Sequence, residues 1–165
     1  MTERETLDAV ASLIGLPRRT GVVGEGKMGA GIAHALLLAG SDVVVVERDE
    51  SAAATARDRV ERAIAESVRR GQMEGLVKAK ARLQVATDME ALAESDLVIE
   101  AVPEELELKL ATLSALETVL TTDAVIGTNT SSISLDTLGG AIPIPSVSWV
   151  CTSSIPCLRA SWWRS

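Results

Sequence analysis

Three glycines near the start of the chain have a spacing that suits phosphate binding. They occupy the first, third and sixth positions of GEGKMG, which follows the apolar run TGVVG and opens a stretch rich in helix formers. The first glycine permits a tight turn, the second lets a pyrophosphate approach the backbone, and the third lets the helix pack against the strand. The free N–H groups at the helix start then attract phosphates. The pattern predicts a dinucleotide-binding site. The alternative is a glycine-rich turn that only packs the helix against the strand and binds no ligand. The residues of this predicted site are Gly24, Glu25, Gly26, Lys27, Met28 and Gly29.

An acidic residue, Glu47, stands directly after the run DVVVV, 18 positions beyond the last of these glycines. A carboxylate there accepts hydrogen bonds from the adenosine ribose hydroxyls and repels a 2′-phosphate. The neighbouring Arg48 argues the other way, because a guanidinium can pair with that phosphate. We give Glu47 the greater weight, so the sequence favours NAD over NADP as the cofactor.

The elements that must position these residues alternate along the chain. The run of four valines is typical of a strand that is buried on both faces of a parallel sheet. We expect Ser51 to cap the helix that follows. Strands that alternate with helices indicate βαβ units, so the predicted fold is α/β, a Rossmann-type doubly wound parallel sheet. The expected strands are 20–24, 41–49, 82–88, 96–102 and 123–130, and the expected helices are 27–40, 51–70, 73–80 and 104–120.

Two polar segments follow the fourth and fifth of these strands, where ligands of doubly wound sheets bind. EAVPE covers residues 100–104, with Lys109 a turn into the next helix, and TNTSS covers residues 128–132. Side chains there can hydrogen-bond a nicotinamide, a carbonyl or a hydroxyl, although a helix cap explains TNTSS equally well. The only histidine, His34, lies on the first helix, and we expect a packed or partly exposed residue rather than a catalyst.

Three motifs, GVVGEGKMGAGIA, DLVIEAVPEELELK and TNTSSISL, together resemble the NAD-binding domain of the 3-hydroxyacyl-CoA dehydrogenases over about residues 19–140. That family oxidises the 3-hydroxyl of an acyl-CoA and passes hydride to NAD, so the resemblance implies an oxidoreductase of fatty acid metabolism. It also implies that Glu47 holds the adenosine ribose and that Ser131 contacts the substrate oxygen and the nicotinamide region. The other residues that it places at the cofactor, beside the glycine hexapeptide and Arg48, are Ala101, Val102, Glu104, Lys109 and Asn129.

Two alternatives stay open beside this resemblance. The 3-hydroxyisobutyrate and 6-phosphogluconate dehydrogenases share a GxGxMG start but fit EAVPE and TNTSS less well. A non-catalytic NAD-binding module is the other alternative, since cofactor binding does not by itself require turnover.

The composition changes abruptly near residue 145. All 23 acidic residues precede that point, whereas residues 146–165 contain all three Trp and both Cys. Two cysteines without a nearby His or acid make a poor metal site, so we expect no metal. Where the family carries a GLHFFNP-like segment with its general-base His, this chain reads WVCTSSIP. A back-translation with one base inserted after the Pro145 codon reads PERFLGLHFFNPVPASIMVEV, which predicts a frameshifted tail.

The frameshift has consequences for organisation and activity. We expect an N-terminal leader at 1–18, an NAD-binding domain at 19–145 and an aberrant tail at 146–165. The helical C-terminal domain of the family, which gives much of its substrate cleft and homodimer contact, is then missing. We therefore expect an inactive chain in which the outer edge of the last strand lies open.

Charge and hydropathy exclude several classes of partner. The formal net charge of −7 opposes nucleic acid binding, because an acidic chain repels phosphate. No apolar run approaches the roughly 18 residues of a membrane span. The first residues lack a basic segment followed by an apolar one, so we expect no secretory signal and a cytoplasmic location.

Overall fold

The computed structural model describes residues 17–24, 26–73, 75–130 and 133, and the backbone of 150–151 and 157–158. Within this part of the chain, no helix is both long and apolar enough to span a bilayer. The strands are β1 (Arg19–Val23), β2 (Asp42–Val46), β3 (Leu83–Ala86), β4 (Leu97–Glu100), β5 (Val125–Thr128), β6 (Val150–Cys151) and β7 (Cys157–Leu158). The helices are α2 (Lys27–Leu38), α3 (Glu50–Arg69), α4 (Leu76–Ala81), α5 (Leu106–Val119) and the 3₁₀ helix η1 (Met89–Leu92).

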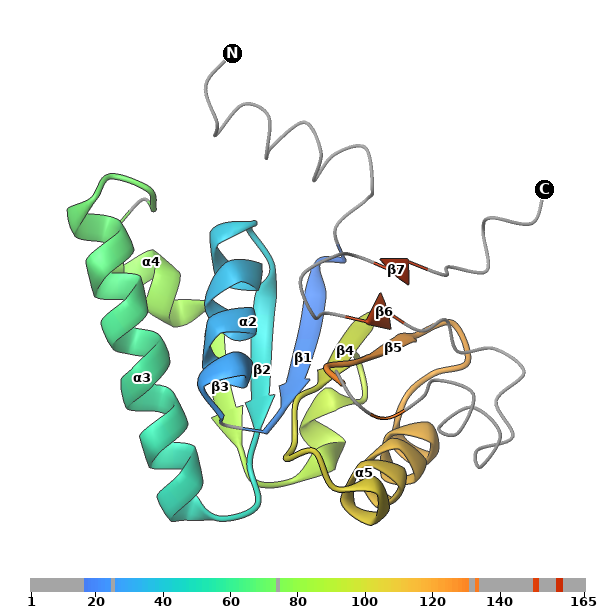
Figure 1. Cartoon of the computed structure of the whole chain (residues 1–165). Coiled ribbons are helices and arrows are strands. Elements are labelled where there is room, and N and C mark those ends of the chain that lie inside the picture. The colour runs from blue at the N-terminus through green and yellow to red at the C-terminus, as the bar shows by residue number, and fades with distance from the viewer. Residues whose placement is uncertain are drawn as a thin grey trace.

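The strands form one sheet in the order β3-β2-β1-β4-β5-β6-β7. Neighbouring strands from β3 across to β6 pair in parallel, and β7 pairs with β6 in the antiparallel direction. The chain moves outward from β1 to β3 and then returns to place β4 on the other side of β1 (Figure 1). This reversal defines a doubly wound sheet, so the predicted Rossmann-type α/β fold is confirmed.

The valine run of β2 is buried on both faces of the sheet, as its composition predicts. Val43 and Val45 belong to the core beneath α2 and α3, whereas Val46 belongs to the core beneath η1 and α5. Side chains of a strand alternate between its faces, so an apolar run gives each face its own core. Helices consequently cover both faces, with α2, α3 and α4 on one and α5 on the other (Figure 1).

The residue that caps α3 is Asp49, so the prediction of Ser51 is wrong. The backbone at Asp49 is still extended, and its carboxylate accepts a hydrogen bond from the Ala52 N–H at 2.8 Å. The helix thus starts at Glu50, and Ser51 already lies in its first turn. The Ala52 N–H and the Arg48 side chain lower the pKa of Asp49, because both stabilise its charged form.

The outer edge of β5 is partly covered, contrary to the open edge that the sequence predicts. Thr128 of β5 is in register with Cys151 of β6, and Cys151 is opposite Cys157 of β7. Unpaired backbone groups on a strand edge favour any extended segment that can pair with them. Since β6 and β7 have two residues each, the cover is short.

Candidate functional site

Four residues from distant parts of the sequence lie in one row at the carboxyl edge of the sheet. Val23 is in register with Val46 on one side and with Glu100 on the other. Glu100 is in turn in register with Thr128 of β5. Each of these residues ends its strand, so the next residue along each strand stands at the ligand-binding edge. These next residues are Gly24, Glu47, Ala101 and Asn129, all predicted from the sequence to contact the cofactor.

The glycine turn joins β1 to α2 with no room for a larger side chain at its first and third glycines. Gly24 has a φ of +104°, which favours glycine, and a Cβ there would lie 2.8 Å from the Ala101 carbonyl. A Cβ on Gly29 would lie 1.9 Å from the carbonyl oxygen of Gly24. The first turn of α2 therefore sits directly on the end of β1, as the first and third glycines of the motif predict.

The middle glycine of the motif faces open space. No described atom lies within 4 Å of the position that a Cβ on Gly26 would take, and the residue is exposed. Met28, two residues on, is 55% exposed. This combination fits a pyrophosphate group, which needs bare backbone next to a helix N-terminus. Glu25 and the side chain of Lys27 lie outside the described residues.

Glu47 and Arg48 differ in their surroundings at the end of β2. Glu47 is only 5% exposed, and its backbone N–H donates to the Ala86 carbonyl at 2.9 Å, which fixes the residue to β3. The Arg48 guanidinium instead contacts the Asp49 carboxylate at 3.1 Å and is largely exposed. Because Arg48 already neutralises the cap of α3, the arrangement suits an unphosphorylated ribose at Glu47.

A buried ion pair joins the ends of β4 and β5 to α5. Neither Glu100 nor Lys109 is exposed, and the Lys109 Nζ lies 2.9 Å and 3.1 Å from the two carboxylate oxygens of Glu100. The same ammonium donates to the carbonyls of Val102 and Asn129, both at 3.3 Å. The Glu100 carboxylate also accepts from the Val102 N–H at 2.7 Å and from the Thr128 hydroxyl at 2.5 Å. Two segments that follow neighbouring strands are thereby tied to one cation.

Glu104 extends this network toward the surface. Its side chain is a third exposed, with one carboxylate oxygen 3.4 Å from the Lys109 Nζ and the other 2.5 Å from the Thr130 hydroxyl. The Thr130 hydroxyl in turn accepts from the Ile133 N–H at 3.2 Å. Asn129 is held through its backbone, which donates to the Glu100 carbonyl at 2.7 Å. Glu104 therefore connects EAVPE to TNTSS.

Sequence reasoning found most of this edge but missed the residue that organises it. Glu100 was seen only as part of the EAVPE segment, and Thr128 only as part of TNTSS. The available signal was an acid at the end of an otherwise apolar, buried strand, LVIE, since a buried charge needs a partner. Ser131, the predicted catalytic residue, lies outside the described residues.

His34 is confirmed as a half-buried helix residue. It lies on α2, and its Nε2 is 2.8 Å from the hydroxyl of Ser67 on α3. Burial lowers the pKa of this imidazole. The hydrogen bond joins two helices on one face of the sheet, so His34 has a packing role in this part of the molecule.

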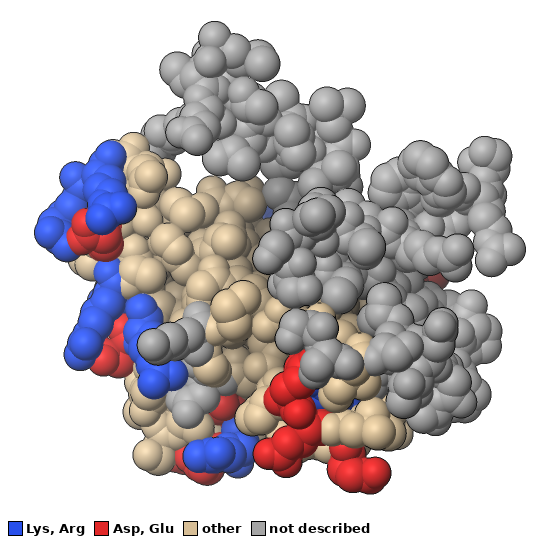
Figure 2. All heavy atoms as spheres, viewed as in Figure 1, with Lys and Arg blue, Asp and Glu red and all other residues tan. Residues whose placement is uncertain are grey.

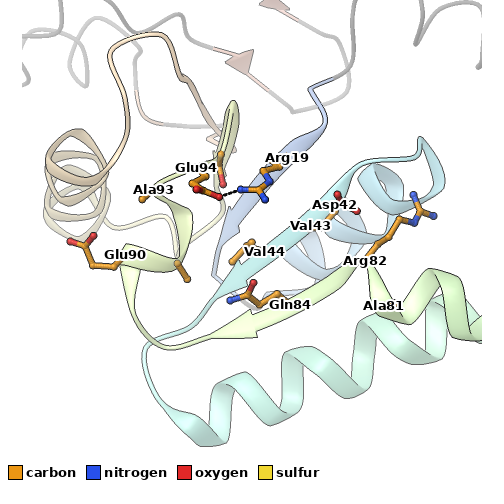
Figure 3. Close-up of a pocket in the computed structure, with 12 residues that line it drawn as sticks. Arg19, Asp42, Val43, Val44, Ala81, Arg82, Gln84, Glu90, Ala93 and Glu94 are labelled. Carbon is orange, nitrogen blue, oxygen red and sulfur yellow. Dashed lines mark ion pairs between the residues drawn. The ribbon is translucent and has the colours of Figure 1, made fainter.

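A cavity of about 350 Å³ lies at the opposite edge of the sheet. Its lining includes Arg19, Asp42 and Arg82, which stand at the amino ends of β1, β2 and β3 (Figure 3). Arg19 forms an ion pair with Glu94, another residue of this lining. This cavity is separated from the glycine turn by the length of the strands, so it is not part of the dinucleotide site.

The outer surface near the candidate site is acidic. Figure 2 shows acidic side chains gathered beside the start of α5 and basic ones along α3. Glu105 and Glu107, at the start of α5, are both exposed. The glycine turn, in contrast, offers the N–H groups of α2 to an anion. The glycine end of the candidate site therefore favours negative groups, whereas the surface beside α5 carries negative charge itself.

Comparison with known proteins decides the family. The sequence model of the 3-hydroxyacyl-CoA dehydrogenase, NAD binding domain, matches residues 19–149. This chain belongs to that family. As its NAD-binding domain, the chain has NAD as its cofactor, and the glycine turn described above has the geometry that NAD requires.

Individual members of the family agree with this assignment. The chain is 37% identical over 132 residues to a 3-hydroxybutyryl-CoA dehydrogenase of Bradyrhizobium diazoefficiens, covering 78% of this chain and 44% of that protein. A 3-hydroxybutyryl-CoA dehydrogenase of Mycobacterium tuberculosis is 36% identical over 131 residues, with 78% and 46% covered.

A solved structure gives the same result. The crystal structure of (S)-3-hydroxybutyryl-CoA dehydrogenase PaaH1 from Ralstonia eutropha superposes with a TM-score of 0.74 at 28% identity, covering 82% of this chain and 49% of that one. The chain thus spans about half the length of these relatives.

Proposed function

We propose that NAD lies across the row of strand ends that the sheet register creates. In this arrangement the backbone of Gly24, Gly26 and Gly29 holds the pyrophosphate, with Glu25, Lys27 and Met28 beside it. Glu47 binds the adenosine ribose, next to Arg48. The nicotinamide half then extends over β4 and β5, toward Ala101, Val102, Glu104, Lys109 and Asn129. The open space at Gly26 between two tightly packed glycines is the observation that carries this proposal.

We propose that this domain comes from an enzyme whose reaction is oxidation of the 3-hydroxyl of a 3-hydroxyacyl-CoA in fatty acid metabolism. The family match and the names of the relatives, which include 3-hydroxybutyryl-CoA dehydrogenases, support this substrate class. Bound NAD supplies the hydride acceptor. Ser131, close in sequence to the Glu104–Thr130 contact, is the residue that we propose to bind the substrate oxygen.

We further propose that the 165-residue chain binds NAD without turning over substrate. Removal of the hydroxyl proton needs a general base, which is most often a histidine. His34 is the only histidine in the sequence, and its imidazole is bonded to Ser67 between α2 and α3. The chain then acts as a non-catalytic NAD-binding module of a catalytic family.

The proposed organisation has a leader at 1–18, the NAD-binding domain at 19–145 and a frameshifted tail at 146–165. The end of the family match at residue 149, close to the change in composition, supports this division. Sequencing of the DNA from the Ile142 codon onward tests it. A displaced frame that reads GLHFFNP would support the frameshift, and a displaced frame without that segment would refute it.

Calorimetric titration of the purified chain with NAD and with NADP tests the cofactor proposal. We expect saturable binding of NAD and much weaker binding of NADP, because Glu47 repels a 2′-phosphate. Assay with acetoacetyl-CoA and NADH tests the lack of turnover. Detectable oxidation of NADH above a blank would refute an inactive chain, whereas failure to bind NAD would refute the cofactor site.

Two further predictions belong to this proposal. We propose a cytoplasmic location, which the bacterial origin of several relatives supports. We also propose that the homodimer of the intact family, whose contact lies largely in its C-terminal domain, does not form with these 165 residues alone. Analytical ultracentrifugation of the purified chain measures its state of association, and a stable dimer would contradict this view.

A further inference from the structure

The buried ammonium of Lys109 raises an electrostatic problem for the proposed cofactor. The sheet order places β2 on one side of β1 and β4 on the other. If the adenosine ribose lies at Glu47 after β2, the nicotinamide half extends across β1 toward β4 and β5. That is the edge where Lys109 is enclosed, in contact with carbonyls of Val102 and Asn129.

The oxidised nicotinamide ring is positively charged and the reduced ring is neutral. An uncompensated cation at the ends of β4 and β5 would therefore weaken binding of NAD more than binding of NADH. Coulombic effects of this kind are stronger inside a protein than in water, because the effective dielectric constant is lower. The charge of Lys109 thus has to be balanced by the protein itself.

Glu100 provides that balance from within the core. Its carboxylate contacts the Lys109 ammonium with both oxygens and is not exposed to solvent. Thr128 and the Val102 N–H hold the same carboxylate from two other directions. Glu100 ends β4 one position before Ala101, and its side chain is fully buried against Lys109, so it acts on the cofactor through Lys109 rather than by contact.

We propose that Glu100 is a positioning residue that balances the charge of Lys109 and so lets the site accept the oxidised form of the cofactor. This inference rests on the proposed binding of NAD. Glu104 is the second carboxylate near this ammonium, with one oxygen 3.4 Å from the Lys109 Nζ and the other bonded to Thr130, and it is a third exposed, whereas Glu100 is fully buried.

The ratio of the dissociation constants for NAD and NADH measures this effect. The two molecules share the adenosine, the ribose groups and the pyrophosphate, so the ratio isolates the charge of the nicotinamide ring. Fluorescence titration of the full chain gives both constants. In E100Q we expect the NAD/NADH ratio of dissociation constants to rise by about twofold to fifteenfold, for charges about 10 Å apart at a dielectric constant of about 20 to 80.

A charge rescue separates this role from simple support of the fold. The double variant E100Q/K109M removes the anion and the cation together, so the ratio is expected to return to that of the unaltered chain. Glu117→Gln is the matched control, because it makes the same Glu-to-Gln change on α5, two turns beyond Lys109. If E100Q fails to fold, Glu104→Gln provides the second measurement, with a rise of the ratio in the same direction.

The outcomes separate this proposal from the one on which it rests. If the unaltered chain binds neither NAD nor NADH, the cofactor proposal fails and this inference fails with it. If the chain binds both and E100Q weakens both equally, Glu100 merely supports the fold and only the present inference is overturned. A shifted ratio that the double variant does not restore would also overturn it.

Discussion

The ammonium of Lys109 lies within 3.1 Å of both carboxylate oxygens of Glu100, and solvent reaches neither side chain. The two residues are separated by the EAVPE loop and the first turn of α5. A buried ion pair of this kind is expensive to break from one side, because the remaining charge loses its partner without regaining water.

Replacement of Lys109 by Met is therefore expected to reduce the free energy of unfolding by about 3 to 5 kcal/mol. Urea denaturation followed by circular dichroism measures the change. Lys78→Met on the exposed side of α4 is the control and should have little effect. If Lys109→Met lowers the free energy of unfolding no more than Lys78→Met does, the ion pair does not stabilise the fold.

Gly29→Ala is expected to disrupt the glycine turn. The added methyl group would lie 1.9 Å from the Gly24 carbonyl oxygen, so either the turn or the start of α2 must move. We expect NAD binding to be lost in calorimetry. Gly31→Ala is the matched control, since no described atom lies within 4 Å of its Cβ position and alanine favours the helix by about 1 kcal/mol. Equal NAD affinity in both variants would refute the close packing.

Glu47→Gln tests the choice between NAD and NADP. The amide keeps the shape of the side chain but removes the charge, so we expect about tenfold weaker NAD binding and a smaller preference over NADP. Parallel titrations with both cofactors measure the two effects. Glu50→Gln, at the exposed start of α3, provides the control. An unchanged NAD preference in Glu47→Gln would show that another residue excludes the 2′-phosphate.

His34 is expected to make stability depend on pH. Burial lowers its pKa below the ordinary value of 6.5, so the unfolded chain binds a proton before the folded chain does. The contribution to stability is complete above that ordinary value and declines as the pH falls through it toward the folded pKa. Urea denaturation from about pH 5 to pH 8 measures this decline. His34→Gln, whose amide can still bond Ser67, should flatten the profile, and an unaltered slope would contradict the assignment.

Asp49 and Ser51 provide a direct comparison of two candidate helix caps. Asp49→Ala removes the acceptor for the Ala52 N–H and is expected to destabilise α3, whereas Ser51→Ala should leave it unaffected. Because the pKa of Asp49 is lowered, its contribution is present at neutral pH and is lost as acid protonates it below its ordinary value of 3.8. Thermal melts at neutral pH rank the two variants, and a larger loss for Ser51→Ala would reverse the assignment.

The glycine turn and the Glu47 position were predictable because local sequence determines them. A tight turn requires glycine at Gly24 whatever the rest of the chain does, and the valine run fixes where β2 ends. The sheet register then follows from burial, since a slip by one residue would exchange the two faces of each strand.

The Glu100–Lys109 pair could not be predicted in the same way. Its members come from a strand and a helix, and their contact depends on how the intervening loop folds around the ammonium. The cap of α3 was missed for a related reason. Asp49 and Ser51 are both good caps by residue type, and only the length of extended chain after β2 decides between them.

The sheet itself fixes the distances between the four residues that follow its strand ends, which are Gly24, Glu47, Ala101 and Asn129. Neighbouring strands are about 4.8 Å apart, so the spacing of the four strand ends is set by backbone hydrogen bonds and not by any side chain. Evolution can lengthen the loops at the amino edge or alter the outer strands without rescaling this row. A strand inserted between β1 and β4 would separate the phosphate turn from the Glu100 network by one full spacing, so the order of the inner strands is the part of the architecture that must be inherited intact.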